Sequence, residues 1–447
     1  MKQKLTVKET VSIASMLFGM FFGAGNLIFP VSMGQLAGRN VWLAIAGFLI
    51  TGVGLPLLGV AALGISRSGG LSELSGKVGK KYGIFFTCLL YLTIGPFFAI
   101  PRCATVPFNT GIEQLLPHAG KLHLFVFSLV FFAIVLAFSL KPGKILTWIG
   151  KILNPIFLVC LGILVIAAFL SPIGTISEIE PSEAYASGTL FKGFLEGYNT
   201  MDALAGLAFG IVVVNVIRGL GVEEPKAVAK NTVFAGVFSC LFMAVIYIAV
   251  TLIGTQSRGI YEASANGGEA LAVIAHHYFG KKGALVLAAI VTMACLKTAI
   301  GLITSCSETF VVMFPNSLSY KPWAVIFCAI SFLVANLGLN TIITYSIPVL
   351  MFLYPLAITL IFLSLFGDKF GNDRVVYGWV TGLTLAAALL DFIAALPKGA
   401  ISVLHAGGLL ELANAYLPFF SIGLGWFIPA ILGLVIGFIV HGRNKRI

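Results

Sequence analysis

The chain has 447 residues, of which 59% are hydrophobic and only 10% are charged, and its formal net charge is +11 at pH 7. Soluble domains carry about 45–50% apolar and about 25% charged residues, so this composition excludes a soluble globule, a disordered chain and a coiled coil. At roughly 20 apolar residues per membrane helix, the composition predicts an all-α polytopic membrane protein with about 12 transmembrane helices.

Twelve apolar stretches are predicted to cross the membrane. They are continuously apolar rather than alternating, which excludes a transmembrane strand barrel. The predicted spans are 10–34, 41–65, 83–112, 123–140, 144–170, 190–217, 231–254, 283–314, 322–338, 341–366, 375–396 and 418–440. The first stretch follows a basic N-terminus, as a secretory signal would. It is too long for one and lacks a small-residue cleavage site, so we interpret it as the first span.

The distribution of basic residues predicts the orientation. Nineteen of the 28 lysines and arginines fall in the tails and loops on the side of the N-terminus, six fall in the other loops, and three lie in or beside a span. Because cytoplasmic loops are enriched in lysine and arginine, both termini of this multi-pass protein are expected in the cytoplasm. The basic residues are scattered through short loops without interleaved aromatic residues, so a nucleic-acid partner is not expected.

The longest loop on the predicted outer side runs from about 255 to 282. It is expected to form either a short helix over the outer mouth or a plain connection. Its adjacent His276 and His277 would point about 100° apart on a helix, which makes them a poor metal pair. The seven cysteines fall in or beside apolar stretches and are interpreted as small apolar residues. No metal site and no cofactor are expected.

The first predicted span carries a run that weakens a helix near its middle. Residues 17–30 read LFGMFFGAGNLIFP, with three glycines in seven residues before Asn26. Glycine loses the most backbone entropy on ordering, and asparagine in hydrocarbon needs hydrogen-bond partners. Close helix packing through Gly19 and Gly23 is the alternative explanation for this run alone.

The sixth predicted span has a matching interruption. Gly197 is followed by polar Asn199, Thr200 and Asp202, again near mid-depth. Two interrupted spans, five apart in order, indicate an inverted repeat with a central binding site. We therefore predict a first five-helix repeat at 9–170, a second, inverted one at 190–366, and two additional transmembrane helices at 375–440.

A broken membrane helix offers free backbone groups at mid-depth. The N-terminal end of a half-helix presents free N–H groups that suit a carboxylate, and the C-terminal end presents carbonyls that suit an ammonium group or a bare cation. A zwitterionic amino acid matches both. Aromatic and small residues around the breaks predict an apolar pocket that prefers leucine, isoleucine or valine over alanine by roughly 1–3 kcal/mol. These residues are Phe21, Phe22, Phe29, Ala205 and Phe209.

Two ionisable residues fall deep inside predicted spans, Asp202 in the sixth and Lys297 in the eighth. A charge at the bilayer centre costs roughly 2.5–3.5 kcal/mol or more, so both side chains should face the protein interior. Both are candidates for a functional role, and a structural ion pair that closes the helix bundle is the alternative. Arg102, between Pro101 and Pro107, is a weaker candidate.

Five stretches have the character of family motifs: FGAGNLIFP at 22–30, GPFFAIPR at 95–102, GYNTMD at 197–202, FGIV at 209–212 and NLGL at 336–339. At these stretches the chain resembles the bacterial branched-chain amino acid carrier proteins of the branched-chain amino acid:cation symporter family. The likeness extends over nearly the whole chain. It implies uptake of leucine, isoleucine and valine across a bacterial plasma membrane, driven by a cation gradient of Na⁺ or H⁺.

That family looks related to transporters with the leucine-transporter fold, which has five plus five inverted spans with broken helices 1 and 6. In that fold the motif matching 23–26 cradles the substrate carboxylate. The resemblance therefore implies that the N–H groups of Ala24, Gly25 and Asn26 bind carboxylate. It also implies that carbonyls near Phe21 and at Asn199 and Thr200 accept the ammonium group. Asp202 and Phe209 complete the expected substrate site.

The same resemblance implies a sodium site, and here the sequence departs from the pattern. The site would use the carbonyls of Gly19, Phe22 and Ala294 and two adjacent hydroxyls, at positions 297 and 298. Position 298 is a threonine, but position 297 is Lys297, and a protonated ammonium group has no lone pair for Na⁺. Either Lys297 substitutes for sodium, with coupling to protons or no coupling, or it turns away to pair with a carboxylate such as Asp202.

Two other classes of function find less support in the sequence. An ion channel would need a charged ring or a carbonyl filter, and neither motif is visible. An intramembrane enzyme would need a His–Glu metal pair, a nucleophile elbow or a close pair of aspartates, and the spans contain none. A secondary active transporter that works by alternating access is therefore the expectation. The oligomeric state has no signal in the sequence.

Overall fold

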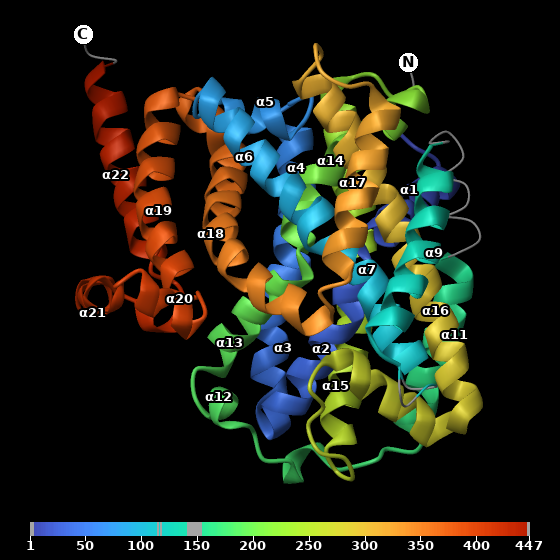
Figure 1. Ribbon diagram of the computed structural model, residues 1–447. Helices are drawn as coiled ribbons and strands as arrows, with labels where there is room; N and C mark the ends of the chain where they lie inside the picture. The colour runs from blue at the N-terminus through green and yellow to red at the C-terminus, as the bar shows by residue number, and fades with distance from the viewer. Residues whose placement is uncertain (1–3, 114–115, 117–118, 141–153, 445–447) are drawn as a thin grey trace.

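The computed structural model describes residues 4–113, 116, 119–140 and 154–444. Every regular element in this part of the chain is helical, as the composition predicts. Both termini lie at the same end of the molecule (Figure 1), as an even number of spans requires. The predicted stretch 144–153, which begins the fifth span, lies outside the described residues.

The helices follow the predicted spans, several of them in two or more pieces. The elements that form the spans are α1 (Val7–Phe21), α2 (Ala24–Ala37), α3 (Val41–Leu49), η2 (Ile50–Gly54), α4 (Leu55–Ile65), α6 (Lys80–Leu92), η3 (Thr93–Phe97), α7 (Ala99–Pro107), η4 (Phe108–Ile112), α9 (Lys121–Ser139), α11 (Asn154–Leu170), α13 (Thr189–Glu196), η8 (Gly197–Thr200), α14 (Asp202–Gly219), α15 (Pro225–Ser257), α16 (Gly267–Met313), α17 (Tyr320–Ala335), α18 (Leu339–Phe366), α19 (Arg374–Ala394) and α22 (Phe427–Asn444). Shorter connecting elements are η1 (Gly38–Asn40), α5 (Leu71–Gly76), η7 (Ile176–Glu178), α12 (Glu183–Ala186), η9 (Gly367–Phe370), α20 (Lys398–Val403), α21 (Gly407–Tyr416) and η10 (Phe420–Ile422).

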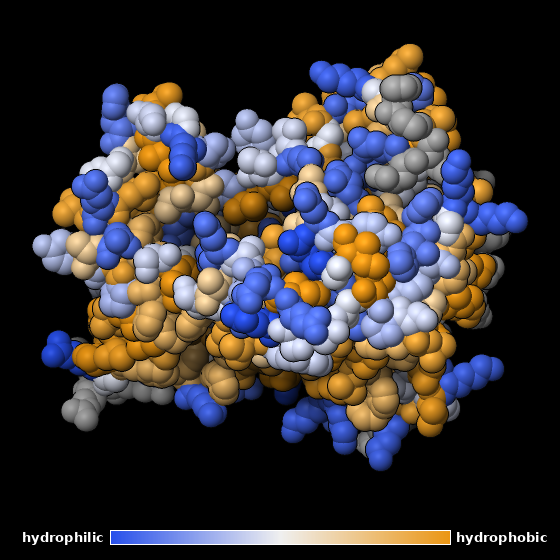
Figure 2. All heavy atoms as spheres, turned by 90° about the horizontal axis from the view of Figure 1, so that it is seen from below, coloured by the Kyte–Doolittle hydropathy of each residue, from blue (hydrophilic) through white to orange (hydrophobic). Residues whose placement is uncertain are grey.

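Length and composition support membrane insertion of this bundle. Eight helical stretches in the described residues are long and apolar enough to cross a membrane, and three shorter apolar helices add to them. On the face seen in Figure 2, hydrophilic side chains gather toward the middle and broad hydrophobic areas lie toward the rim, with further hydrophilic side chains projecting around the outline. This distribution suits a bundle whose rim faces lipid and whose end faces water.

The last predicted span begins later than expected. The prediction places its start at residue 418, but α22 begins at Phe427. Residues before it form the short helices α20 and α21, which lie across the end of α19 and α22 (Figure 1). Phe419 and Gly423 both have positive φ, which ends helical geometry at these positions, so hydrophobicity alone misplaced the boundary.

The third span is interrupted as well, which the sequence analysis did not anticipate. Gly95 has φ −88° and ψ −124°, outside the helical region, and Pro96 follows it. A residue before proline is disfavoured in helical geometry, and proline itself donates no backbone hydrogen bond. The Gly95–Pro96 pair therefore interrupts the span between α6 and α7.

The loop predicted at about 255–282 contains a helix, which is one of the two predicted alternatives. α16 begins at Gly267, and Asn266 caps it by accepting hydrogen bonds from the N–H groups of Gly268 and Glu269 over 2.9 Å and 3.1 Å. The helix turns sharply at Gly280, where φ is +60°. The part before the turn packs on α2, because a Cβ on Gly267 would lie 1.8 Å from the carbonyl oxygen of Ile28.

The two broken spans are embedded in equivalent ways, as an inverted repeat requires. α2, from the first span, packs against α15, and α14, from the sixth span, packs against α4. In both contacts the two backbones approach closely. A Cβ on Gly34 would lie 2.0 Å from the Thr251 carbonyl oxygen, and a Cβ on Gly206 would lie 2.6 Å from the Pro56 carbonyl oxygen. Each broken span is therefore held by the span that follows the other one, with glycine at the crossing.

A candidate substrate site at two helix breaks

The first break lies at Phe22 and Gly23. α1 ends at Phe21, Phe22 has ψ 98° and Gly23 has an extended backbone, and α2 begins at Ala24. The side-chain oxygen of Asn26 accepts a hydrogen bond from the Gly23 N–H over 2.8 Å. This bond caps the break, and it leaves the first amides of α2 without an intrahelical acceptor.

The second break lies between α13 and α14. The α-helical geometry of α13 changes to the 3₁₀ turn η8, and Met201 then adopts a left-handed conformation with φ 63°. The hydroxyl of Thr200 donates to the Gly197 carbonyl over 2.9 Å and accepts from the Asp202 N–H over 3.3 Å. Both breaks therefore fall where the sequence placed them.

A buried polar network joins the two breaks. The amide nitrogen of Asn26 donates to an Asp202 carboxylate oxygen over 2.7 Å, and the Tyr247 hydroxyl donates to the same oxygen over 2.5 Å. Asn26 also donates to the Tyr247 hydroxyl. All three side chains are almost completely buried. Tyr247, on α15, was missed by the sequence analysis, because a single tyrosine in an apolar span carries no pattern of its own.

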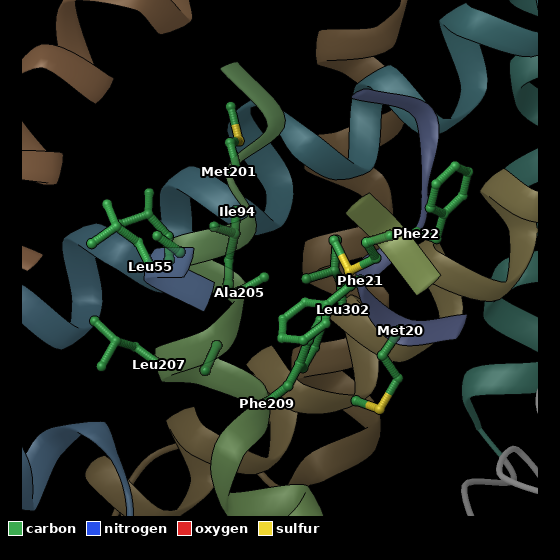
Figure 3. Close-up of a cluster of buried hydrophobic side chains, with 14 of the residues drawn as sticks. Met20, Phe21, Phe22, Leu55, Ile94, Met201, Ala205, Leu207, Phe209 and Leu302 are labelled. Carbon is green, nitrogen blue, oxygen red and sulfur yellow. The ribbon is translucent and has the colours of Figure 1, made fainter. Parts of the chain in front are cut away.

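A small cavity lies between the breaks. Of the residues predicted to bind substrate, it is lined by Phe21, Ala24, Gly25, Asn26, Thr200, Asp202 and Phe209. The apolar part of its wall includes Met20, Ile94, Ala205 and Leu302, and Figure 3 shows these side chains gathered around Phe21 and Phe209. Its volume is about 30 Å³, enough for one or two water molecules. An amino acid of leucine's size therefore needs side-chain or helix movement to enter.

Arg102 lies in the wall of this cavity and contacts the second break. Its guanidinium donates to the Asn199 carbonyl over 2.8 Å and to the Ser346 hydroxyl on α18, and it lies 5.2 Å from the centre of the Phe29 ring. Among the described residues that line the cavity, Arg102 and Asp202 are the charged ones. The cavity wall thus presents one fixed positive and one fixed negative group, as a zwitterion would require.

The position of Asn199 differs from its predicted role. Its carbonyl was expected to accept the substrate ammonium group, but here it accepts from Arg102, and Asn199 does not line the cavity. A carbonyl that already bonds a guanidinium is a poor second cation acceptor. On this side the cavity is lined instead by Thr200, Asp202 and the end of α1.

The residues predicted for the cation site lie beside the first break. The Thr298 hydroxyl is 3.3 Å from both the Phe22 and the Ala294 carbonyl oxygens, so three of these residues meet. Gly19 is buried in the last turn of α1. The Lys297 ammonium lies 5.5 Å from the centre of the Phe18 ring and 4.9 Å from that of Phe157, on α11. Lys297 is fully buried and does not line the substrate cavity.

Broken helices around a central cavity define a class of secondary transporter, and similarity to known proteins identifies the family. A family model described as branched-chain amino acid transport protein matches residues 6–444. The chain is 56% identical to the branched-chain amino acid permease BrnQ of Lactobacillus delbrueckii subsp. lactis, over 96% of each chain. It is 44% identical to BrnQ of Bacillus subtilis, over 98% of each.

Solved structures share the fold at low sequence identity. Mhp1, a nucleobase-cation-symport-1 family transporter in a closed conformation with bromovinylhydantoin bound, matches with a TM-score of 0.62 and 15% identity, over 97% of this chain and 92% of that one. MhsT in complex with L-phenylalanine matches with a TM-score of 0.56 and 16% identity, over 98% and 99%. The fold is therefore the leucine-transporter fold that the family resemblance implied, and it contains the two breaks predicted from the sequence. The chain belongs to the branched-chain amino acid transport protein family, and it is a multi-pass membrane transporter, not an enzyme.

Proposed function

We propose that this protein imports leucine, isoleucine and valine across a bacterial plasma membrane by alternating access, with both termini in the cytoplasm. The observation that carries the proposal is the pairing of opposite charges around an apolar cavity. The free amides at the start of α2 face the same space as the Asp202 carboxylate. A zwitterion with a hydrocarbon side chain complements the free amides, the Asp202 carboxylate and the apolar wall of the cavity.

In the proposed complex, the carboxylate of the substrate binds the N–H groups of Ala24 and Gly25, where the positive end of the α2 dipole adds to the attraction. The ammonium group lies toward Asp202 and the carbonyl end of α1. The aliphatic side chain packs against Phe21 and Phe209, whose ring centres are 6.2 Å apart. Each buried methylene contributes about 0.8 kcal/mol, which favours branched-chain substrates over alanine.

For the coupling ion, we propose that the Lys297 ammonium takes the place of Na⁺. It lies one residue before Thr298, whose hydroxyl contacts the Phe22 and Ala294 carbonyls of the predicted sodium site. Flanking aromatic rings stabilise a buried cation by about 2 kcal/mol when it is desolvated. A resident cation at this position makes transport independent of sodium, and we propose that a proton gradient drives it instead.

The test is uptake of radiolabelled leucine into proteoliposomes, with the sodium and proton gradients imposed separately. We expect uptake that is competed by isoleucine and valine, that responds to an inward proton gradient, and that a sodium gradient leaves unchanged. Full dependence on sodium would refute the role given to Lys297 while leaving the substrate assignment intact. Absence of saturable leucine uptake under every gradient would refute the substrate assignment.

A further inference from the structure

A second and larger cavity lies away from the substrate site, between the second repeat and the C-terminal pair of helices. Its walls come mainly from α13 and α18 on one side and from α19 and α22 on the other, with Ile50 and Leu55 added from the second span, and its volume is about 800 Å³. That volume lies within the range of cavities that hold a drug-sized molecule. We call it the C-terminal groove.

The groove is lined almost entirely by hydrocarbon. Apart from Thr359, Trp426 and Lys369, every lining residue is aliphatic or a phenylalanine. The Thr359 hydroxyl is already used, because it donates to the Pro355 carbonyl over 2.9 Å. Several phenylalanines of the wall remain exposed, including Phe362 at 43% and Phe438 at 44%. An apolar recess of this size in a membrane-spanning bundle is filled by hydrocarbon chains rather than by water.

One end of the groove carries a positive charge, that of Lys369. Lys369 lies in η9, the turn between α18 and α19, and its ammonium is 5.1 Å from the centre of the Phe366 ring. The neighbouring Asp368 carboxylate accepts a hydrogen bond from Asn372 over 3.3 Å. In the predicted topology this turn lies on the side that carries most of the lysines and arginines of the chain. A phosphate placed at the mouth of the groove therefore meets a positive charge.

The groove follows α22 from its first residue over much of its length. Its wall on α22 extends from Phe427 to Phe438, eleven residues apart, which corresponds to about 16 Å of helix. An acyl chain that starts from a headgroup at Lys369 would thus have an apolar wall of this length on α22 to pack against.

We propose that the C-terminal groove is a binding site for an anionic phospholipid of the bilayer, with the phosphate at Lys369 and an acyl chain between α18 and α22. The lipid fills the space between the C-terminal pair and the transport core. One wall of the groove is α13, the half-helix that ends at the second break, so lipid packing there also supports the broken sixth span.

Trp426 lines the groove and gives the test a local probe. The full-length protein, with the other four tryptophans changed to phenylalanine, is reconstituted with phospholipids whose acyl chains carry bromine, a fluorescence quencher. Half-maximal quenching of Trp426 is expected at about fivefold lower mole fraction of brominated phosphatidylglycerol than of brominated phosphatidylcholine, the preference that one lysine near a lipid surface confers. Lys369→Ala should abolish this preference and Lys369→Arg should keep it.

Two matched controls complete the experiment. Lys321→Ala removes an exposed lysine at the start of α17, outside the groove, and should leave the preference intact. A chain that keeps Trp379 alone reports the general bilayer, because Trp379 is 43% exposed on α19, and both lipids should quench it equally. Equal quenching of Trp426 by the two lipids, or quenching of Trp379 but not of Trp426, would overturn the proposal. Neither result depends on the transported substrate.

Discussion

Asn26 and Asp202 lie 176 residues apart in the chain and share a hydrogen bond of 2.7 Å that joins the two helix breaks. The side-chain oxygen of Asn26 also accepts a hydrogen bond from the Gly23 N–H, so this one side chain caps the first break and contacts the second. Because both partners are buried, a change to either one alters the geometry at both breaks. The bond thus couples the two halves of the candidate substrate site.

Removing the charge of Asp202 should impair uptake strongly. Asp202→Asn loses the carboxylate that accepts from Asn26 and Tyr247, and hydrogen bonds to charged groups contribute about 1.5–3 kcal/mol. We expect leucine uptake at low substrate concentration to fall roughly 10- to 100-fold. Asp391→Asn is the matched control, since Asp391 is a buried carboxylate on α19 that does not line the cavity. Equal losses in both variants would contradict a specific role for Asp202.

Tyr247→Phe should give a smaller loss. The variant keeps the ring, which stacks near Phe22 and packs edge-on against Phe48, and removes only the hydroxyl. The variant loses one of the two hydrogen bonds to the Asp202 carboxylate, which contributes about 1.5 kcal/mol at the lower end of the range for charged groups, so uptake should fall roughly tenfold. Combined with Asp202→Asn, it should add little further loss, because the hydroxyl acts through that carboxylate. Fully additive losses in this double-mutant cycle would argue against the network.

Gly25→Ala should narrow the cavity. A Cβ at this position would lie 3.3 Å from the Phe29 ring and 3.4 Å from Cα of Thr200, tighter than comfortable packing. We expect a raised KM for leucine in uptake assays, and a larger effect for Gly25→Val. Gly301→Ala is the control, because no atom lies within 4 Å of the corresponding Cβ and its uptake should match the wild type. A wild-type KM in Gly25→Val would place the substrate elsewhere.

Lys297→Thr should change the coupling ion. The substitution places a hydroxyl next to Thr298, beside the Phe22 and Ala294 carbonyls, and removes the resident cation. Leucine uptake by the variant is expected to gain stimulation by an inward sodium gradient and to lose its response to a proton gradient. Lys297→Met, which supplies no oxygen ligand, should lose the proton response without gaining sodium stimulation. If the threonine and methionine variants behave alike, the proposed exchange of lysine for sodium is wrong.

Arg102→Gln should loosen the closure of the cavity between α7, the second break and α18. The guanidinium donates to Asn199 and to Ser346, and these bonds tie the three elements together. Cys103, the next residue, is 1% exposed and lines the cavity, so it reports on access. In a chain with Cys103 as its single cysteine, we expect a membrane-impermeant thiol reagent to react roughly tenfold faster in the variant. Unchanged reactivity would mean that Arg102 does not close this path.

Local composition was sufficient to place the two breaks. The glycine run at 19–25 and the polar run at 197–202 destabilise a helix wherever they occur, and at membrane depth such runs persist only around a cavity. The break at Gly95 had the same kind of local signal, a glycine before proline, and was passed over because the span looked apolar throughout. The boundary of the last span was misplaced for the same reason, since backbone turns at Phe419 and Gly423 leave hydropathy unchanged.

The amino-acid sequence by itself determined the membrane class, the helical architecture and the two positions where helices end at mid-depth, because these follow from composition and from local backbone preferences. Only the tertiary structure decided which groups meet. The contacts of Tyr247 with Asp202, of Arg102 with the Asn199 carbonyl, and of Lys297 with its two aromatic rings all join distant parts of the chain. Contacts of this kind depend on how the spans cross, and no local preference encodes a crossing.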